Sequence, residues 1–366
     1  MDYKVPQLEP YVGKEELRNL KRVIEGKWLT EGPFSKEFVS RIEKFTGSKH
    51  VLLANNGTLA LYLSLLGLGV GRGDEVIVPD FTFIASGSSV RFTGAKPVFV
   101  DITKDNLNID PTKIEKAITK KTKAIMPVHV YGQSADMNPI LEIAEKHNLR
   151  VIEDAAQGFG VFYKSKHTGT LGDIGMISFF ADKTITTGEG AAILINDEEL
   201  YEKTIMIRNQ GRKSSGTFIH EVLGMNFRMT DLQCAVGVAQ IKKFEKIKRI
   251  KLRNYALYKK LLRDVEEIEF LKIKDYTNFV PFRVNVMVKR KEGLMAFMEK
   301  NRIQTRGFFY PLHRQPCFRD LGYKDDEFQI SNLAFDRGTS LPVFCSLKEE
   351  HIEYVCGTIE RFYDGK

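Results

Sequence analysis

Lys183 is the residue of this sequence best suited to nucleophilic chemistry. It lies in a loop, residues 181–190, that follows the apolar run 175–180 and holds paired glycines and few apolar side chains. A lysine in a loop is ordinarily a solvated surface charge. A neutral lysine amine in a shielded site can instead form a covalent imine with a carbonyl compound. Ser178, near the end of the same run, adds a hydroxyl close to it in the chain.

A carboxylate stands at the end of a second apolar run. Asp154 follows residues 150–153, and Gln157 comes three residues later, where it could point the same way. A buried carboxylate is costly to desolvate unless a cation meets it. Read alone, Asp154 could also cap the next helix or pair with an arginine.

A third group could bind an anion. Residues 51–54 lead into Asn55-Asn56-Gly57-Thr58 and then into an apolar helix. The free amides at the start of a helix favour anions such as phosphate. Thr58 could equally be a simple helix cap.

These groups share one edge of a predicted sheet. Between residues 50 and 195, short apolar runs alternate with helical patterns, and the expected strands are 51–54, 75–78, 97–102, 124–130, 150–153, 175–180 and 192–195, with helices at 58–66, 111–118 and 137–147. This alternation predicts an α/β fold whose mostly parallel central sheet has helices on both faces. Ligands bind at the carboxyl ends of such strands, where the polar residues lie.

Together the polar residues match the needs of pyridoxal 5'-phosphate (PLP). That cofactor requires a lysine for its covalent link, a carboxylate facing its pyridine nitrogen and donors for its phosphate. An aromatic side chain could also stack on its ring. The candidates are Lys183 for the link, Asp154 for the carboxylate, Gly57, Thr58 and Ser178 for the phosphate, and Phe83 for the stacking.

Length and charge limit the classes of protein to consider. The 366 residues suggest two domains and exclude a peptide hormone or a lone binding module. The net charge of +8 permits attraction to nucleic acid or to anionic metabolites. Many of the cations lie in residues 242–263 among apolar residues at helical spacing, which predicts a solvated helix face rather than a DNA-binding stripe. We expect no nucleic-acid partner.

Metal-binding, membrane and export signals are weak. The seven histidines form no HxxxH pair and the four cysteines no CxxC pair, which predicts no metal site and reduced thiols. The longest apolar stretch, residues 59–70, is too short to span a bilayer, and the first residues lack the apolar core of a signal peptide. We expect a cytoplasmic protein with no membrane partner.

The chain resembles the DegT/DnrJ/EryC1/StrS family of sugar aminotransferases from Pro6 to about Tyr354. The motifs that carry the resemblance lie at residues 56–58, 73–79, 127–132, 153–157, 186–190, 224–231 and 310–313. The resemblance implies an aspartate aminotransferase-like, type I PLP fold. It implies a large PLP-binding domain at residues 1–245, with an N-terminal segment lining the substrate pocket, and a smaller C-terminal α+β domain at 246–366.

The resemblance also implies roles for single residues. Lys183 would hold PLP and shuttle a proton, Asp154 would pair with the pyridine nitrogen, and Gln157 would touch the ring hydroxyl. Asn226 would reach the phosphate of the neighbouring subunit, so a homodimer with shared active sites follows. The residues near the substrate would be Trp28, Thr30, Glu31, Arg228, Tyr310 and His313. From the residues alone, His313 would be a surface histidine and Trp28 a core anchor.

Lys183 also favours one reaction class. Family members with a histidine in place of this lysine catalyse dehydration, so Lys183 indicates transamination. Ala191 and Cys234 depart from the family's usual glycine and alanine. Both residues are small, so we expect only local adjustment.

The substrate expectation rests on resemblance within the family. Residues 179–190 and 220–224 look most like the members that use L-glutamate to aminate C4 of GDP-4-keto-6-deoxy-D-mannose, giving GDP-perosamine for O-antigen and surface polysaccharide. An aminotransferase for a UDP- or dTDP-linked keto sugar is the alternative. A non-catalytic PLP-binding regulator is a remote alternative, because we expect no DNA-binding appendage before residue 50 or after 350.

Overall fold

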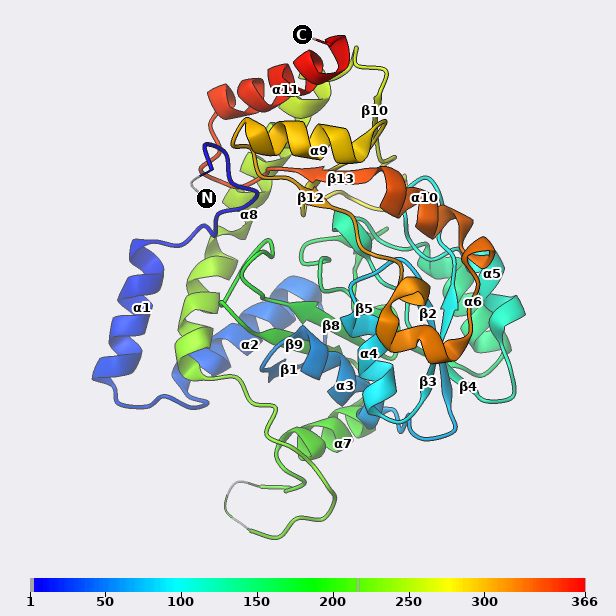
Figure 1. The fold of residues 1–366 in the computed structure, drawn as a ribbon. Coiled ribbons are helices and arrows are strands. Elements are labelled where there is room, and N and C mark those ends of the chain that lie inside the picture. Colours follow the sequence, from blue (N-terminus) through cyan, green and yellow to red (C-terminus); the bar gives the residue numbers. More distant parts are fainter. Residues whose placement is uncertain (1–2, 215, 217, 366) are drawn as a thin grey trace.

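A seven-stranded sheet forms the centre of the molecule (Figure 1). The computed structural model describes residues 3–214, 216 and 218–365. The strands run in the spatial order β1-β9-β8-β5-β4-β2-β3, and β9 is antiparallel to both of its neighbours while the other pairs are parallel. They are β1 (His50–Ala54), β2 (Glu75–Pro79), β3 (Lys96–Val100), β4 (Thr122–Ile125), β5 (Arg150–Asp154), β8 (Ile174–Ser178) and β9 (Ala191–Ile195). The predicted α/β class and mostly parallel sheet are confirmed.

Helices cover both faces of this sheet because its strands are apolar on both sides. In β1, Leu52 and Ala54 pack into one core, whereas Val51 and Leu53 pack into another. The first core contains α3 and the second contains α2. The helices of this region are α1 (Lys14–Glu25), α2 (Pro33–Thr46), α3 (Gly57–Gly67), α4 (Ala85–Phe92), α5 (Pro111–Ala117), α6 (Met137–Lys146) and α7 (Glu198–Arg208). A small hairpin, β6 (Phe162–Tyr163) and β7 (Lys166–His167), follows β5.

The long helix α8 (Asp231–Leu261) leads from the central sheet to a second layer of structure (Figure 1). A capping box begins it, in which Thr230 Oγ1 accepts a hydrogen bond from Gln233 N at 3.3 Å. Phe244 and Ile247 pack into the central core, whereas Tyr255 and Tyr258 pack into the second core. The domain boundary near residue 246 stays a prediction.

The second layer is an antiparallel sheet with helices. Its strand order is β10-β11-β13-β12. The elements are β10 (Ile268–Phe270), β11 (Val284–Val288), α9 (Lys291–Lys300), β12 (Arg306–Gly307), α10 (Gln329–Arg337), β13 (Gly338–Leu341) and α11 (Glu349–Asp364). Val5, near the other end of the chain, joins this core through a bridge to Ile303.

The sequence predicted a solvated face for the basic run of α8, but one of its lysines is buried in the structure. Lys251 is 5% exposed, and its Nζ donates to the Phe282 carbonyl at 3.4 Å. Burial lowers the pKa of this amine to about 8. Residues such as Lys242 and Arg249 are exposed, so the prediction is wrong for Lys251, which tertiary packing encloses.

No helix within the described residues is long and apolar enough to cross a membrane.

Candidate active site

The carboxyl ends of β5 and β8 meet the start of α3. Asp154 of β5 pairs with Met176 of β8, so Asp154 and Ser178 reach the same edge of the sheet. Gly57 is the first residue of α3, and a Cβ on it would lie 3.4 Å from Ser178 Cβ and 3.5 Å from Ser178 Oγ. The structure therefore brings the predicted carboxylate and the predicted phosphate donors to one edge.

The start of α3 is capped by Asn56 rather than by Thr58. Asn56 Oδ1 accepts a hydrogen bond from Leu59 N at 3.0 Å. The alternative that Thr58 is a simple cap is thus wrong, because the residue with extended backbone before the helix is Asn56. The first amides of α3 have no partners within the helix, which suits them to a phosphate.

Asp154 is buried without a cation partner among the described ion pairs. Its Oδ2 accepts from Ser86 Oγ at 2.7 Å and its Oδ1 accepts from Ala156 N at 3.1 Å. Burial raises the pKa of Asp154, and these two hydrogen bonds oppose the rise. A protonated ring nitrogen would supply the missing positive charge, so this carboxylate fits PLP.

Ser86 was not predicted from the sequence. It lies in α4, three residues after Phe83, and so belongs to the segment that follows β2. Its position after a strand of the parallel sheet was the signal that could have identified it.

Lys183 follows a turn that begins at the end of β8. Its backbone N donates to the Phe180 carbonyl at 2.9 Å, and its Nζ lies 4.6 Å from the centroid of the Phe282 ring. Burial lowers the pKa of Lys183, whereas the neighbouring Asp182 raises it and Arg283 lowers it further. A lysine amine held toward its neutral form can act as a nucleophile and as a base.

Asp182 connects this loop to the second sheet. Its Oδ2 accepts from Arg283 Nη2 at 2.6 Å and lies 3.6 Å from Arg306 Nη1. Its Oδ1 lies 3.5 Å from Lys183 Nζ. None of Asp182, Arg283 and Arg306 was predicted, because the arginines are more than a hundred positions along the chain and only tertiary structure brings them here.

Gln157 is fixed by a strained turn. Its Oε1 accepts from the backbone N of Tyr131 at 2.7 Å, and Tyr131 has a left-handed φ of 58°. Gly132 follows with φ 84°, and a Cβ there would lie 1.8 Å from the Val280 carbonyl oxygen. This bond orients the Gln157 amide, whose contact with the ring hydroxyl stays a prediction.

Two candidate aromatic residues are solvent-exposed. Phe83 is 57% exposed, and its ring centroid lies 6.3 Å from that of Phe309. Tyr310 is 41% exposed and makes an edge contact with Phe335. Exposed rings at the sheet edge can cover a flat ligand, and their specific roles stay predictions.

The segment that was predicted to line the substrate pocket is tied to the start of α8. Trp28 is 59% exposed and donates its indole N–H to the Glu31 carbonyl at 2.7 Å, so its assignment as a core anchor is wrong. Thr30 and Glu31 follow, and Glu31 forms an ion pair with Arg208. Asp231 accepts from the Ser35 backbone N at 2.6 Å. The indole satisfies its donor within its own turn and needs no burial.

The Asn226 segment lies beside the start of α3. Asn55 N donates to the Phe227 carbonyl at 3.1 Å. Asn226 itself is exposed and accepts from Arg228 N at 3.1 Å, while Arg228 Nη1 donates to Asn209 Oδ1 at 2.6 Å. The reach of Asn226 into a neighbouring subunit stays a prediction.

His313 is buried between two carboxylates, so its assignment as a surface histidine is wrong. Its Nδ1 lies 2.8 Å from Asp80 Oδ2 and its Nε2 lies 2.9 Å from Asp325 Oδ1. Its ring stacks on Phe328 with 4.4 Å between centroids. Although burial lowers the pKa of His313, the carboxylates raise it above its usual value. Contact between His313 and a sugar stays a prediction.

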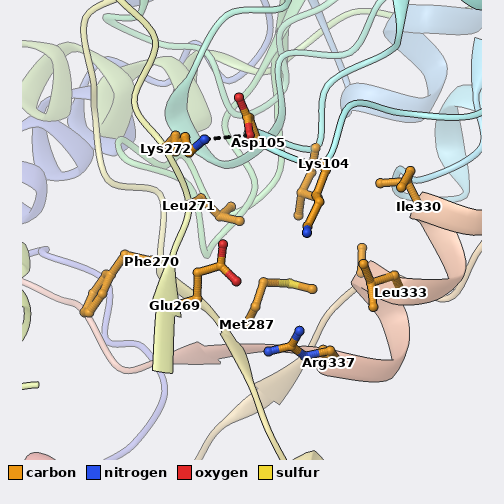
Figure 2. Close-up of a pocket in the computed structure, with 12 residues that line it drawn as sticks. Lys104, Asp105, Glu269, Phe270, Leu271, Lys272, Met287, Ile330, Leu333 and Arg337 are labelled. Carbon is orange, nitrogen blue, oxygen red and sulfur yellow. Dashed lines mark ion pairs between the residues drawn. The ribbon is translucent and has the colours of Figure 1, made fainter. Parts of the chain in front are cut away.

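A separate cavity between the two sheets contains none of the predicted site residues (Figure 2). Asp105, after β3, pairs there with Lys272 at 3.1 Å and with Lys274 at 2.6 Å. These ion pairs link the central sheet to the segment after β10.

Comparisons with known proteins match the whole fold. The model of the DegT/DnrJ/EryC1/StrS aminotransferase family matches residues 10–360. GDP-perosamine synthase of Escherichia coli O157:H7 is 36% identical over 99% of each chain, and that of Caulobacter vibrioides is 39% identical over 91% of each. The solved PLP form of Spr1654 from Streptococcus pneumoniae is 25% identical over 99% of each chain, with a TM-score of 0.94.

Proposed function

The chain belongs to the DegT/DnrJ/EryC1/StrS aminotransferase family, and we propose that it transfers an amino group from L-glutamate to C4 of GDP-4-keto-6-deoxy-D-mannose. It is a PLP-dependent nucleotide-sugar aminotransferase. The proposed product is GDP-perosamine, a building block of O-antigen or another surface polysaccharide, made in the cytoplasm.

One observation carries this choice of substrate. Two relatives named GDP-perosamine synthase are 36% and 39% identical to the chain over nearly their whole lengths. The buried Asp154 and the largely enclosed Lys183 support the reaction class, because Lys183 can attach the cofactor and Asp154 can hold its ring nitrogen protonated.

PLP, when bound, supplies an electrophilic carbon for the amine and an electron sink for the α-carbon. The amides of Gly57 and Thr58 and the Ser178 hydroxyl would hold its phosphate, and Phe83 would cover its ring. In the first half reaction Lys183 Nζ would move a proton from the α-carbon of glutamate to the cofactor. In the second half reaction it would move a proton from the cofactor to C4 of the sugar. Burial lowers the pKa of Lys183, so the neutral amine required for the first transfer is available at a lower pH.

The proposed enzyme is a homodimer with shared active sites. The described residues of the segment between α7 and α8 project from the body (Figure 1) and include exposed apolar side chains, with Phe218 91%, Ile219 72% and Leu223 99% exposed. Exposed apolar groups of this kind favour an interface. They stand just before Asn226, the residue proposed to reach the partner's phosphate site.

Mixing two variants, each lacking one group of the proposed site, tests the shared sites. K183A lacks the catalytic amine and N226A lacks the proposed contribution to the partner. A hybrid dimer would hold one site with both groups intact, so mixing the variants should recover turnover. The absence of recovery, with subunit exchange verified by a mass tag, would contradict the shared arrangement.

The substrate proposal is tested by nucleotide competition and by product analysis. GDP should bind the purified enzyme more tightly than UDP or dTDP, and GDP-4-keto-6-deoxy-D-mannose with L-glutamate should give GDP-perosamine by mass spectrometry. Tighter binding of UDP, or no conversion of the GDP-linked sugar, would overturn the choice.

A further inference from the structure

Two arginines of the second sheet converge on one carboxylate beside the catalytic lysine. Arg283, just before β11, donates Nη2 to Asp182 Oδ2 at 2.6 Å, and Arg306 of β12 places Nη1 at 3.6 Å from the same oxygen. The Arg283 side chain is 10% exposed and that of Arg306 is 57% exposed. The Arg283 guanidinium is therefore enclosed by the protein, whereas the Arg306 guanidinium is accessible to solvent.

Positive charge is in excess around this carboxylate. A small cavity beside Asp182 is also lined by Lys183, Lys251 and Glu9, and the two guanidiniums contact Asp182 directly, so four cations stand near two carboxylates. Glu9 accepts a hydrogen bond from Ser346, and the remaining titratable groups lining the cavity are Tyr11 and Cys345. An excess of partly buried cations attracts an anion, and a guanidinium recognises a carboxylate in particular.

Asp182 also has an unused acceptor. Its Oδ1 is buried and has no hydrogen-bond partner among the described residues, although Lys183 Nζ lies 3.5 Å away. When an incoming amine replaces Lys183 on the cofactor, the released lysine amine can donate to this oxygen. Asp182 therefore has one oxygen for the arginines and one for the displaced lysine.

Covalent geometry identifies the anion that fits. The amine of the donor must react where Lys183 Nζ is attached, and its α-carboxyl carbon lies only about 2.5 Å from its nitrogen. That carboxylate must therefore lie near Asp182, since Asp182 Oδ1 is 3.5 Å from Lys183 Nζ. The diphosphate of a nucleotide sugar is separated from C4 by the sugar ring and reaches a more distant region.

We infer that Arg283 and Arg306 form the binding site for the α-carboxylate of the amino donor. Asp182 pairs with these arginines in the resting protein, and the donor carboxylate displaces it. The inference rests on the proposed function, because it assumes an amino-acid donor. The resident carboxylate pairs with both guanidiniums in the resting protein, so the enclosed Arg283 is not left as an unpaired buried charge. The second sheet thereby contributes the recognition of the donor.

Glutarate tests the site without any reaction, because it has the carboxylates of glutamate and no amine. Its dissociation constant is measured by calorimetry on the PLP-loaded enzyme and on R306Q, a change at an exposed side chain. Loss of a charged hydrogen bond should weaken glutarate binding by about tenfold or more. The KM for glutamate should rise similarly, with the KM for the keto sugar unchanged.

R150Q is the matched control. Arg150 is 61% exposed, pairs with Asp173 at 2.6 Å and begins β5 at the opposite edge of the sheet from the site. This variant should bind glutarate as the unchanged enzyme does. The inference is overturned if R306Q also binds glutarate normally, or if R306Q loses affinity for GDP instead.

D182N gives a prediction of opposite sign. Removing the resident carboxylate relieves competition for the arginines, so glutarate should bind more tightly than to the unchanged enzyme. A purely structural role for Asp182 would weaken binding or leave it unchanged, and either result counts against the inference. If glutamate fails as a donor while glutarate binding still depends on Arg306, the proposed function fails and the carboxylate site stands. If glutamate reacts but glutarate binding ignores Arg306, only the inference fails.

Discussion

Ser86 holds the carboxylate that we assign to the cofactor's ring nitrogen, and its removal should weaken cofactor binding. Its hydroxyl donates to Asp154 Oδ2 at 2.7 Å, and Asp154 is 4% exposed. In S86A, Asp154 Oδ2 loses this donor. The only other described hydrogen bond to the carboxylate is the one from Ala156 N at 3.1 Å.

The size of the effect follows from the chemistry of this bond. A hydrogen bond to a charged group contributes about 1.5 to 3 kcal/mol. Burial already raises the pKa of Asp154, and loss of the bond should raise it by about one to two further units, since one unit corresponds to about 1.4 kcal/mol. A carboxylate that protonates more readily pairs less well with a protonated ring. We expect the dissociation constant of PLP to rise about tenfold to a hundredfold.

The measurement is a titration of cofactor-free S86A with PLP, followed by visible absorbance. S64A is the control, because Ser64 is also fully buried and donates one hydrogen bond, to the Ala60 carbonyl at 2.8 Å, within the neighbouring helix α3. S64A should bind PLP normally. If S86A binds PLP within twofold of the unchanged protein, Asp154 does not depend on Ser86 and the reasoning is refuted.

Three further changes have defined outcomes. K183A should abolish turnover while light scattering shows an unchanged mass, and residual transamination would contradict the role of Lys183. Burial lowers the pKa of Lys251 from 10.5 to about 8. Below pH 8 the charged amine therefore lowers the free energy of unfolding by roughly 3 kcal/mol, and this loss should disappear as the pH rises from 8 to 10.5. K251M should therefore unfold at a higher urea concentration than the unchanged protein at pH 7, and this difference should shrink toward pH 10. A lower urea midpoint for K251M at pH 7 would contradict the reasoning. The pKa of His313 is raised above 6.5 in the folded protein. The stabilisation from its protonated ring is therefore fully present below pH 6.5 and is lost as the pH rises through the pKa of the folded state. H313N should lower the free energy of unfolding by about 2 kcal/mol at pH 6, the size of a hydrogen bond to a charged group, and by less at pH 9. An equal loss at both pH values would exclude the ionic contribution.

The central sheet could be predicted because its strands are buried on both faces. Strands such as β8 and β9 therefore appear in the sequence as short continuous apolar runs. Helix α4 gave no such signal, because its buried face carries Ser86 and Ser89, whose hydroxyls are hydrogen-bonded. A helix that buries serines lacks the apolar periodicity by which helices are recognised.

Some residues of the candidate site could be predicted from the sequence and others could not, for the same physical reason. Asp154 and Ser178 end two neighbouring parallel strands and Lys183 follows the second of them, so these residues must meet at one edge of the sheet. Arg283 and Arg306 come from the second sheet, whose approach to the first depends on the packing of α8. No local pattern records that approach. Trp28 and Lys251 were misassigned because residue type alone does not determine burial.

The most direct test of the proposed activity is the visible absorbance of the purified protein before and after addition of L-glutamate. We expect a PLP band that bleaches as the cofactor takes up the amino group, and that returns when the keto sugar is added. A band that ignores glutamate would contradict the donor and the half reaction. A protein that stays colourless with added PLP would contradict the assignment of Lys183 and Asp154 as a cofactor site.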